Sequence, residues 1–410
     1  MKNDPGRSVG RVTAWRLIQV NANARKADTL APLQSNGDTD MPESAVVADD
    51  LGPAKVIHIQ ERSIGLRAAL VIDNVARGPA IGGMRMAPDV SVEECARLAR
   101  AMTLKNAAAG LAHGGGKSVL WGDPRMPRAD KEKLIRAFAH ALRNETDYIF
   151  GPDMGTDESC MAWIKDEIGR AAGLPEAVGG IPLDEIGATG WGVAECAEVA
   201  APLAGFALKG ARFAVQGFGA VGKHAARFLA QKGAILVAAS DSNGSLLDPD
   251  GLDVDALVRH KEAGAPLADF VRGRKLGRDA VLSAECDILI PAARPDVVRK
   301  DNATSIRARL MLQGANIPCT DSAEQLLHEH GVLVVPDFIA NAGGVICAAM
   351  EYHGSTRAAV FAAISEKIRA NTAEVLALAR DTNVPPREAA VEMAGKRVRA
   401  AMALRRFSTM

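Results

Sequence analysis

Apolar side chains recur with two spacings along the chain, one typical of β-strands and one typical of helices. Near the start of the chain the spacing is that of β-strands. Residues 54–60 (AKVIHIQ) and 66–75 (LRAALVIDNV) are short apolar runs rich in β-branched side chains, and the turn formers Ser63 and Gly65 separate them. This pattern predicts two strands joined by a turn.

The next part of the chain changes from strand-like to helical patterning. Residues 78–88 (GPAIGGMRMAP) are rich in glycine and proline, which indicates a loop held close to another part of the molecule. Ser91 and Glu94 then form a capping-box pair, and the pattern of residues 91–110 predicts a helix.

The second half of the chain alternates between strands and helices. Residues 212–241 have the pattern of a βαβ unit, with strand RFAVQ, loop GFGAVG, helix KHAARFLAQKG and strand AILVAASD. Further apolar strands are expected at CDILIPA, RLMLQGAN and GVLVVPDF, and Ala-rich helices at residues 357–380 and 387–404. Strands that alternate with helices predict an α/β fold with a parallel sheet covered by helices on both faces.

Length and composition narrow the class of protein. A chain of 410 residues is long enough for two domains. Lys plus Arg equals Asp plus Glu at 49 each, so no overall field favours nucleic acid or an anionic membrane as a partner. No apolar run approaches the roughly 18–20 residues that span a bilayer, and residues 1–45 lack the apolar core of a signal peptide. We therefore expect a cytoplasmic protein with a loosely ordered extension over residues 1–45.

Cysteine and histidine spacing argues against a disulfide scaffold and against a metal site. The six cysteines are far apart and form no CxxC pair, which is typical of reduced thiols. His328 and His330 form the only close histidine pair, but two residues apart on a helix their rings point to different faces. We therefore predict no metal cofactor.

Residues 217–222 form a GxGxxG loop in the context that dinucleotide binding requires, after a strand and at the start of a helix. Its members are Gly217, Phe218, Gly219, Ala220, Val221 and Gly222. Gly217 would permit the tight turn, Gly219 the approach of a pyrophosphate to the helix N-terminus, and Gly222 close helix packing. Asp241 ends the next strand, where it would accept hydrogen bonds from ribose hydroxyls. This favours NAD, although a cation such as Lys223 could reverse the preference towards NADP.

Two lysines and an aspartate occupy segments that need a chemical explanation. Lys105 lies at the flank of the apolar face of its helix, where a lysine is costly to desolvate without a partner. Lys117 follows three glycines, which would let a substrate approach, and a crowded or desolvated lysine has the lowered pKa useful in acid–base chemistry. Asp153 lies in a tight turn, a common setting for functional carboxylates. HGGGKS does not match the phosphate-binding P-loop, because Leu111 stands where that motif needs glycine.

Seven segments in order make the chain resemble the glutamate/leucine/phenylalanine/valine dehydrogenase family over about residues 50–400. They are GGMRM, MTLKNAAAGLAHGGGKS, GPDMGT, ATGWG, VQGFGAVG, QGAN and PDFIANAGGV. The resemblance implies NAD(P)-dependent oxidation of an L-amino acid to a 2-oxo acid and ammonia by a homo-oligomer. It also implies a substrate domain over residues 46–190, completed by helices at 346–410, and a Rossmann-type domain over residues 191–345.

The same resemblance assigns roles to the charged residues. Lys105 would hold the substrate α-carboxylate by charge-assisted hydrogen bonds. Lys117 would activate water and stabilise the developing oxyanion. Asp153 would move protons at the substrate nitrogen.

Three further residues are assigned to the nicotinamide end of the cofactor. Thr189 and Asn341 would orient the carboxamide. Asn316 would contact the ribose.

Two positions bear on the substrate side chain. Glutamate-specific members carry a lysine before the GG of the first motif and a serine three residues after NAGGV, and here these positions hold Ile81 and Ala348. Together with Gly83 they would line the substrate site. A buried distal carboxylate would be strongly disfavoured there unless a cation such as Arg85 compensates, so the pattern favours an apolar substrate such as leucine, valine or phenylalanine.

Other segments leave alternatives open. GGIPLDEIGATG and SDSNGSLLDPDGLD resemble glutamate dehydrogenases more than leucine-type members, so glutamate dehydrogenase is the alternative among enzymes. The alternative from another class is a non-catalytic homologue that binds amino acid or NAD as a signal. The presence of Lys105, Lys117 and Asp153 together argues against it, because a pure binder has no need of Asp153.

Overall fold

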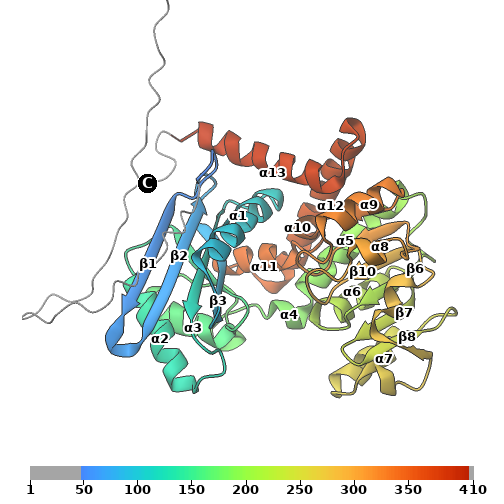
Figure 1. Cartoon of the computed structure of the whole chain (residues 1–410), viewed down its shortest axis with the longest axis horizontal. Helices are drawn as coiled ribbons and strands as arrows, with labels where there is room; N and C mark the ends of the chain where they lie inside the picture. The colour runs from blue at the N-terminus through green and yellow to red at the C-terminus, as the bar shows by residue number, and fades with distance from the viewer. Residues whose placement is uncertain (1–47, 406–410) are drawn as a thin grey trace, which may run out of the picture.

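The computed structural model describes residues 48–405 and shows two β-sheets that lie side by side, each flanked by helices (Figure 1). The first sheet has five strands and the second has seven. The α/β class expected from the sequence is confirmed. The extension predicted over residues 1–45 lies outside the described residues.

The first sheet has the strand order β1-β2-β4-β3-β5. The bounds are β1 Lys55–Glu61, β2 Leu66–Asn74, β3 Ala80–Ala87, β4 Gly114–Trp121 and β5 Tyr148–Pro152. β1 and β4 pair antiparallel with β2, and β3 pairs parallel with both β4 and β5. The predicted strand–turn–strand pattern at the start of the chain is therefore confirmed as β1 and β2.

Three helices pack on this sheet and bury both of its faces. α1 (Val92–Ala108) covers one face over β2 and β4, while α2 (Arg128–Ala141) and α3 (Glu158–Ile168) cover the other. The predicted helix start is confirmed, since the Ser91 hydroxyl accepts a hydrogen bond from the Glu94 N–H at 3.0 Å. This cap sets where α1 begins, and so also where its last turn meets the sheet.

The segment 78–88, expected to be a loop, is instead a strand. It forms β3, which lies between β4 and β5 and is buried over most of its length. Its glycines suggested a loop, but packing requires at least one of them: a Cβ at Gly82 would lie 1.8 Å from the carbonyl oxygen of Gly116. Strand glycines allow this kind of close backbone approach.

The second sheet has the strand order β12-β11-β10-β6-β7-β8-β9. The bounds are β6 Arg212–Gln216, β7 Ile235–Asp241, β8 Gly244–Leu247, β9 Arg274–Leu276, β10 Ile288–Pro291, β11 Leu310–Leu312 and β12 Leu333–Val335. The strands from β12 to β7 run parallel, as predicted, and β8 and β9 add an antiparallel edge. Because β7 and β10 flank β6 on opposite sides, the strand order reverses at β6, and ligands of such sheets bind in the crevice at that point.

The remaining α-helices of residues 48–405 pack around the second sheet and then lead back to the first. They are α4 Leu183–Ile186, α5 Ala188–Leu203, α6 Ala220–Gln231, α7 Val254–Glu262, α8 Lys300–Ala303, α9 Asp321–Glu329, α10 Asp337–Ala340, α11 Gly343–Tyr352, α12 Arg357–Thr382 and α13 Pro386–Ala403. The helices expected at 357–380 and 387–404 are confirmed as α12 and α13.

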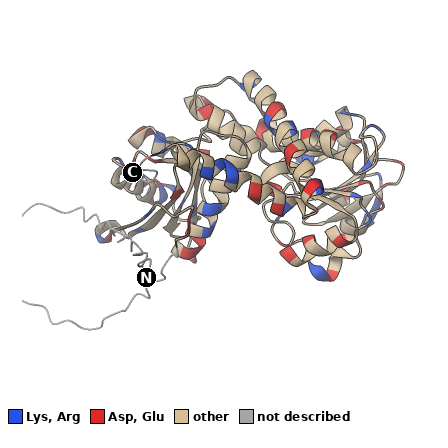
Figure 2. Ribbon diagram, turned by 90° about the horizontal axis from the view of Figure 1, so that it is seen from above, with Lys and Arg blue, Asp and Glu red and all other residues tan. Residues whose placement is uncertain are grey.

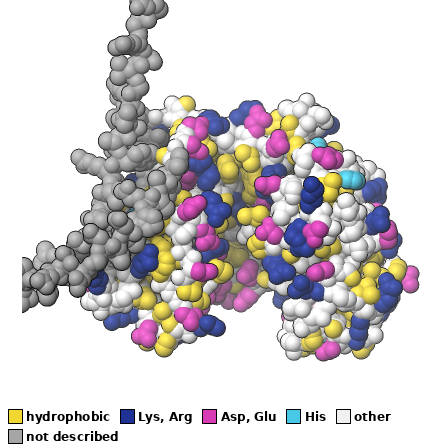
Figure 3. Space-filling view, viewed as in Figure 1, with side chains coloured by type: hydrophobic (Ala, Val, Ile, Leu, Met, Phe, Trp, Pro, Cys, Tyr) yellow, Lys and Arg dark blue, Asp and Glu magenta, His cyan; other side chains and the backbone are white. Residues whose placement is uncertain are grey.

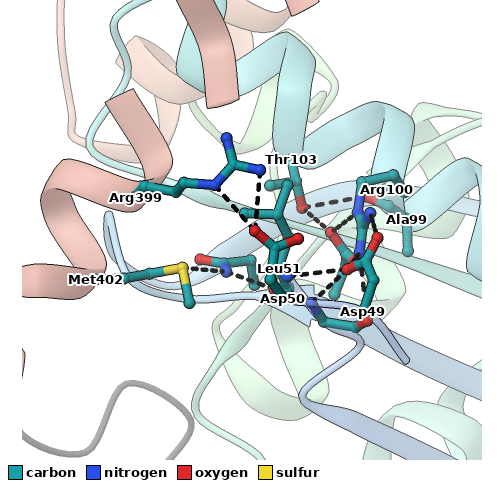
Figure 4. Close-up of polar contacts among 11 residues, drawn as sticks. Asp49, Asp50, Leu51, Ala99, Arg100, Thr103, Arg399 and Met402 are labelled. Atoms are coloured by element: carbon teal, nitrogen blue, oxygen red, sulfur yellow. Dashed lines mark hydrogen bonds and ion pairs between the residues drawn. The ribbon is translucent and has the colours of Figure 1, made fainter. Parts of the chain in front are cut away.

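The last helix, α13, connects the end of the chain to its beginning. Arg397 donates hydrogen bonds to two carbonyl oxygens in the last turn of α1. Figure 4 shows the neighbouring contacts, in which Arg399 of α13 reaches Asp50 and Arg100 of α1 holds Asp49. These bonds tie the segment before β1 to both helices.

The two halves leave a hollow between them in the space-filling view (Figure 3). Acidic and basic residues are interspersed over both halves (Figure 2), in keeping with the balanced composition. Among residues 48–405, no helix has the length and apolar character that crossing a bilayer demands.

Candidate active site

The structure brings Lys117 and Asp153 into direct contact. Lys117 Nζ lies 2.5 Å from Asp153 Oδ2. Lys117 is on β4 and only 6% exposed, and Asp153 directly follows β5. Because β3 separates β4 from β5 in the sheet, the two side chains meet across β3.

Gly83 is the residue of β3 that lets them meet. A Cβ on Gly83 would lie 2.7 Å from the Cβ of Asp153 and 3.1 Å from Nζ of Lys117. Any side chain at this position would therefore push the ion pair apart. The site therefore requires glycine at position 83 of β3.

The glycines before Lys117 have a packing role, whereas the sequence suggested that they make room for substrate. A Cβ on Gly115 would lie 2.0 Å from the backbone nitrogen of Thr103 in α1. A Cβ on Gly116 would lie 2.9 Å from the ring of Tyr148. These glycines let α1 and the ring of Tyr148 approach β4, and so place Lys117 relative to both.

Arg85 adds two further ion pairs to the contact between Lys117 and Asp153. Its Nε lies 3.2 Å from Asp153 Oδ2, and its Nη1 pairs with Glu94 of α1. Ile81, Gly83 and Arg85 alternate along β3 and so project from one face of the sheet. The sequence does not predict the pairing of Arg85 with Asp153. Residues 78–88 are predicted as a loop, and only a strand places every second side chain on the same face.

Asp153 is held as an ionised carboxylate. Burial opposes its ionisation, but Lys117 and Arg85 outweigh burial and hold the pKa of Asp153 below its ordinary value. The turn is fixed by Thr156, whose hydroxyl accepts from the Asp153 N–H at 3.0 Å and donates to the carbonyl of Met84 at 2.7 Å. The free site thus presents a fixed proton acceptor.

Lys105, in the last turn of α1, reaches across to the other half of the molecule. Its Nζ lies 3.3 Å from Oδ1 of Asn316, which follows β11. Burial lowers the pKa of Lys105 to about 8, with Asp337 opposing the shift and Lys117 adding to it. Lys105 is therefore largely charged at neutral pH, as an anchor for a carboxylate has to be.

Ile81 and Ala348, which are far apart in the sequence, meet in one small apolar cluster. Its buried members are Ile81, Ile149 and Ala172, and Ala348 and Tyr352 pack against them. The cluster joins β3 and β5 to α11. Since Ile81 lies two residues along β3 from Gly83, the cluster borders the ion pair.

The GFGAVG loop joins β6 to α6 at the point where the strand order reverses. Gly217 has a φ of +95°, and a Cβ on Gly222 would lie 2.0 Å from the carbonyl oxygen of Gly217, so α6 packs directly on the loop. By contrast, a Cβ on Gly219 would meet nothing within 4 Å. This open space lies beside the first N–H groups of α6, which fits the approach of a pyrophosphate.

Thr189, Asn316 and Asn341 gather on the side of the crevice that faces Lys105. Thr189 lies beside the start of α11, where a Cβ on Gly344 would be 2.9 Å from its hydroxyl. Asn341 Nδ2 donates to Asn316 Oδ1 at 3.1 Å, and among the described residues the buried Oδ1 of Asn341 has no partner. Leaving a buried acceptor unpaired is costly, and a carboxamide N–H would satisfy it. The residues present therefore fit a nicotinamide.

Asp241, at the end of β7, is already engaged by protein donors. Its Oδ2 accepts from Lys261 Nζ at 2.7 Å and from the Leu267 N–H at 2.8 Å. Burial opposes ionisation of Asp241, but these donors hold the pKa of its carboxyl below the ordinary value. Lys261 and Lys223 line the same surface pocket as Gly219, so cations stand near the expected ribose site.

Comparison with known families accounts for most of the chain. Residues 179–406 match the model described as Glutamate/Leucine/Phenylalanine/Valine dehydrogenase, and residues 54–170 match the dimerisation domain of Glu/Leu/Phe/Val dehydrogenases. The chain belongs to this family. It is an amino-acid dehydrogenase that acts on a CH–NH2 group, and members of the family use NAD or NADP.

Individual relatives agree with the family assignment. The chain is 37% identical over 357 residues to a glutamate dehydrogenase of Aeropyrum pernix, which covers 81% of this chain and 85% of the relative. It is 35% identical over 293 residues to an NADP-specific glutamate dehydrogenase of Saccharolobus shibatae, with 68% and 69% covered. A Leu-bound, hetero-hexameric glutamate dehydrogenase from Thermus thermophilus has a similar structure, with a TM-score of 0.75, 29% identity, and 86% of this chain and 90% of that chain covered.

Proposed function

We propose that the protein catalyses the reversible oxidative deamination of an apolar L-amino acid, of the leucine, valine or phenylalanine type, to its 2-oxo acid and ammonia. The apolar cluster carries this proposal. Ile81 and Ala348 occupy the positions at which glutamate-specific members have lysine and serine. Both belong to the same apolar cluster. A distal carboxylate placed there would lose its hydration without gaining a partner.

Arg85 is a poor substitute for the missing lysine. Its Nη1 is paired with Glu94 and its Nε lies 3.2 Å from Asp153. Turning Arg85 towards a substrate would remove the partner of Glu94 and leave Asp153 with Lys117 alone, which is costly. Glutamate is therefore the second candidate substrate, favoured by relatives of 37% and 35% identity that carry the name glutamate dehydrogenase.

Each of the three charged residues would have a separate role in the reaction. Bound NAD(P) would supply the acceptor for the hydride that leaves the α-carbon. Lys105 would hold the α-carboxylate, and Asp153 would take a proton from the substrate nitrogen. Lys117, 2.5 Å from Asp153, would stabilise the oxyanion that forms when water adds to the imine.

We further propose that residues 46–190 and the helices of residues 346–410 form the substrate domain, and residues 191–345 the NAD(P)-binding domain of a homo-oligomer. The match of residues 54–170 to a dimerisation domain supports the assembly. Light scattering on the purified protein measures it, and a monomeric mass at assay concentration would contradict it.

A substrate panel tests the proposed activity. Glutamate, leucine, valine and phenylalanine are assayed with NAD and with NADP, and kcat/KM should be highest for an apolar substrate. Activity confined to glutamate would refute the proposal.

A pair of substitutions tests the cluster itself. Ile81→Lys combined with Ala348→Ser restores both polar positions and should raise the kcat/KM ratio of glutamate to leucine by at least about tenfold. Ile235→Lys introduces the same lysine at a β7 position that is 40% exposed, and should leave the ratio unchanged.

A further inference from the structure

A buried ionic network supports the nicotinamide side of the site. Arg387, in the first turn of α13, donates from Nη2 to Gln313 Oε1 at 2.8 Å and to Asp337 Oδ1 at 3.0 Å. Its Nε donates to Glu324 Oε2 at 2.6 Å. The three acceptors are buried: Gln313 directly follows β11, Glu324 is in α9 and Asp337 begins α10. Because the arginine fork is planar and rigid, it holds them in one arrangement.

Asp337 connects this network to the turn that carries Asn316. Its second oxygen, Oδ2, accepts from the Ile317 N–H at 3.0 Å. Ile317 has a φ of +48°, a conformation that β-branched residues rarely adopt, so the turn depends on bonds that hold it. Asn316 then presents its Oδ1 to Lys105 Nζ at 3.3 Å.

Asp337 also acts on Lys105 through its charge. The charged groups that act on Lys105 are Asp337 of α10 and Lys117 of β4, and Asp337 itself is paired with Arg387. Burial lowers the pKa of Lys105, while the negative charge of Asp337 opposes that shift. Removing this charge would therefore lower the pKa of Lys105 further.

We propose that Asp337, held by Arg387, is a positioning residue for the substrate anchor: it fixes the turn at residues 316–317, through which Asn316 meets Lys105, and it places a carboxylate in the surroundings of Lys105. The inference rests on the proposed role of Lys105 as the partner of the substrate α-carboxylate.

The test follows the binding of a carboxylate that has no amino group. 4-Methylpentanoate should compete with an apolar amino acid. Its own charge is constant from about pH 6 upwards, so the pH dependence of its Ki reports on the anchor. In the wild type, Ki should rise about tenfold per pH unit once the pH exceeds the pKa of Lys105, which is about 8. Wild-type binding that stays constant to high pH would overturn the assigned role of Lys105.

Asp337→Asn removes the charge but retains size and an oxygen that can accept from the Ile317 N–H. We expect the pH at which Ki begins to rise to fall by about one unit. The Kd for NADH, measured by fluorescence titration, should stay within about twofold, since the GFGAVG loop is untouched. A pH profile identical to that of the wild type would overturn the proposal.

Arg387→Lys tests the positioning role independently and applies even if Asp337→Asn does not fold. It keeps the positive charge but cannot bridge three acceptors. We expect kcat to fall by about tenfold or more with the pH profile unchanged, and a wild-type kcat would overturn the role of Arg387. Lys396→Met, at an exposed position of α13 paired with Glu392, is the matched control and should change neither quantity.

The test separates this inference from the proposed substrate. If the wild-type panel identifies glutamate, pentanedioate replaces 4-methylpentanoate, and the proposal about Asp337 is tested in the same way. If no amino acid is oxidised, calorimetric binding of both carboxylates replaces Ki, and pH-independent binding would refute the inference.

Discussion

At the scale of single residues, the site depends on one ion pair and on the glycine that lies between its members. Lys117 and Asp153 approach to 2.5 Å across β3, and Gly83 provides the space in which they meet. The Lys117 side chain is buried, and two charges interact more strongly in a buried site than in water. Substitutions here should therefore affect catalysis much more than binding of the cofactor.

Lys117→Ala should lower kcat by about 10³-fold or more, because the developing oxyanion loses its stabilising charge. The Kd for NADH should stay within about twofold, since Lys117 lies on the first sheet and the GFGAVG loop on the second. Steady-state assays and fluorescence titration measure the two effects. Undiminished turnover would contradict the role assigned to Lys117.

Gly83→Ala should lower kcat by about 10²-fold, because its Cβ would lie 2.7 Å from the Cβ of Asp153 and displace the carboxylate. The control is Gly277→Ala, where a Cβ would meet nothing within 4 Å and φ is –59°. That variant should retain wild-type kcat. Equal activity of the two variants would show that the spacing of the ion pair does not limit the reaction.

At the scale of elements, α7 changes what the end of β7 presents to a ligand. A carboxylate at this place in a dinucleotide-binding sheet favours the free ribose hydroxyls of NAD over the 2′-phosphate of NADP. Here Lys261 of α7 lies 2.7 Å from Asp241 and compensates its charge. The preference expected from β7 alone is therefore weakened by a neighbouring helix.

Lys261→Gln should lower kcat/KM for NADP relative to NAD by about tenfold, because Asp241 would then repel a 2′-phosphate without compensation. Lys275→Gln, at an exposed position of β9, is the control and should leave the ratio unchanged. The ratio is measured from initial rates with both cofactors. An unaltered ratio in Lys261→Gln would mean that this lysine does not face the 2′ position.

At the scale of the whole molecule, α13 contacts both halves of the site. Its first turn holds the Arg387 network beside the second sheet, and Arg397 donates to the carbonyl oxygens of Ala107 and Ala108 at 3.2 and 2.8 Å. Lys105 lies in that same last turn of α1. One helix thus connects the turn that carries Lys105 to the Arg387 network beside the second sheet.

Arg397→Ala should lower the free energy of unfolding by about 1–3 kcal/mol, because it leaves helix-end carbonyls and Asn371 without their charged donor. Arg399→Ala, two residues further along α13, removes a surface pair with Asp50 and should cost about 0–1 kcal/mol. Urea unfolding followed by circular dichroism compares them. Equal losses would argue against a connecting role for Arg397.

The sequence by itself determined the features that depend on near neighbours along the chain. The cap at Ser91, the turn and helix of the GFGAVG loop and the alternating strands of the second sheet could all be predicted, because caps, tight turns and periodicity are local. The order of the seven family segments was also enough to predict the family, which the comparisons confirm.

Only the tertiary structure decided which distant residues meet. The local pattern of residues 78–88 predicts a loop and not β3, because the glycines are explained only by neighbouring strands that the local pattern does not contain. Ile81 of β3 and Ala348 of α11 join one apolar cluster, and Arg387 of α13 bonds to Asp337 of α10, although a long stretch of chain separates the members of each pair. Contacts of this kind follow from burial and packing between elements, and no periodicity within one segment encodes them.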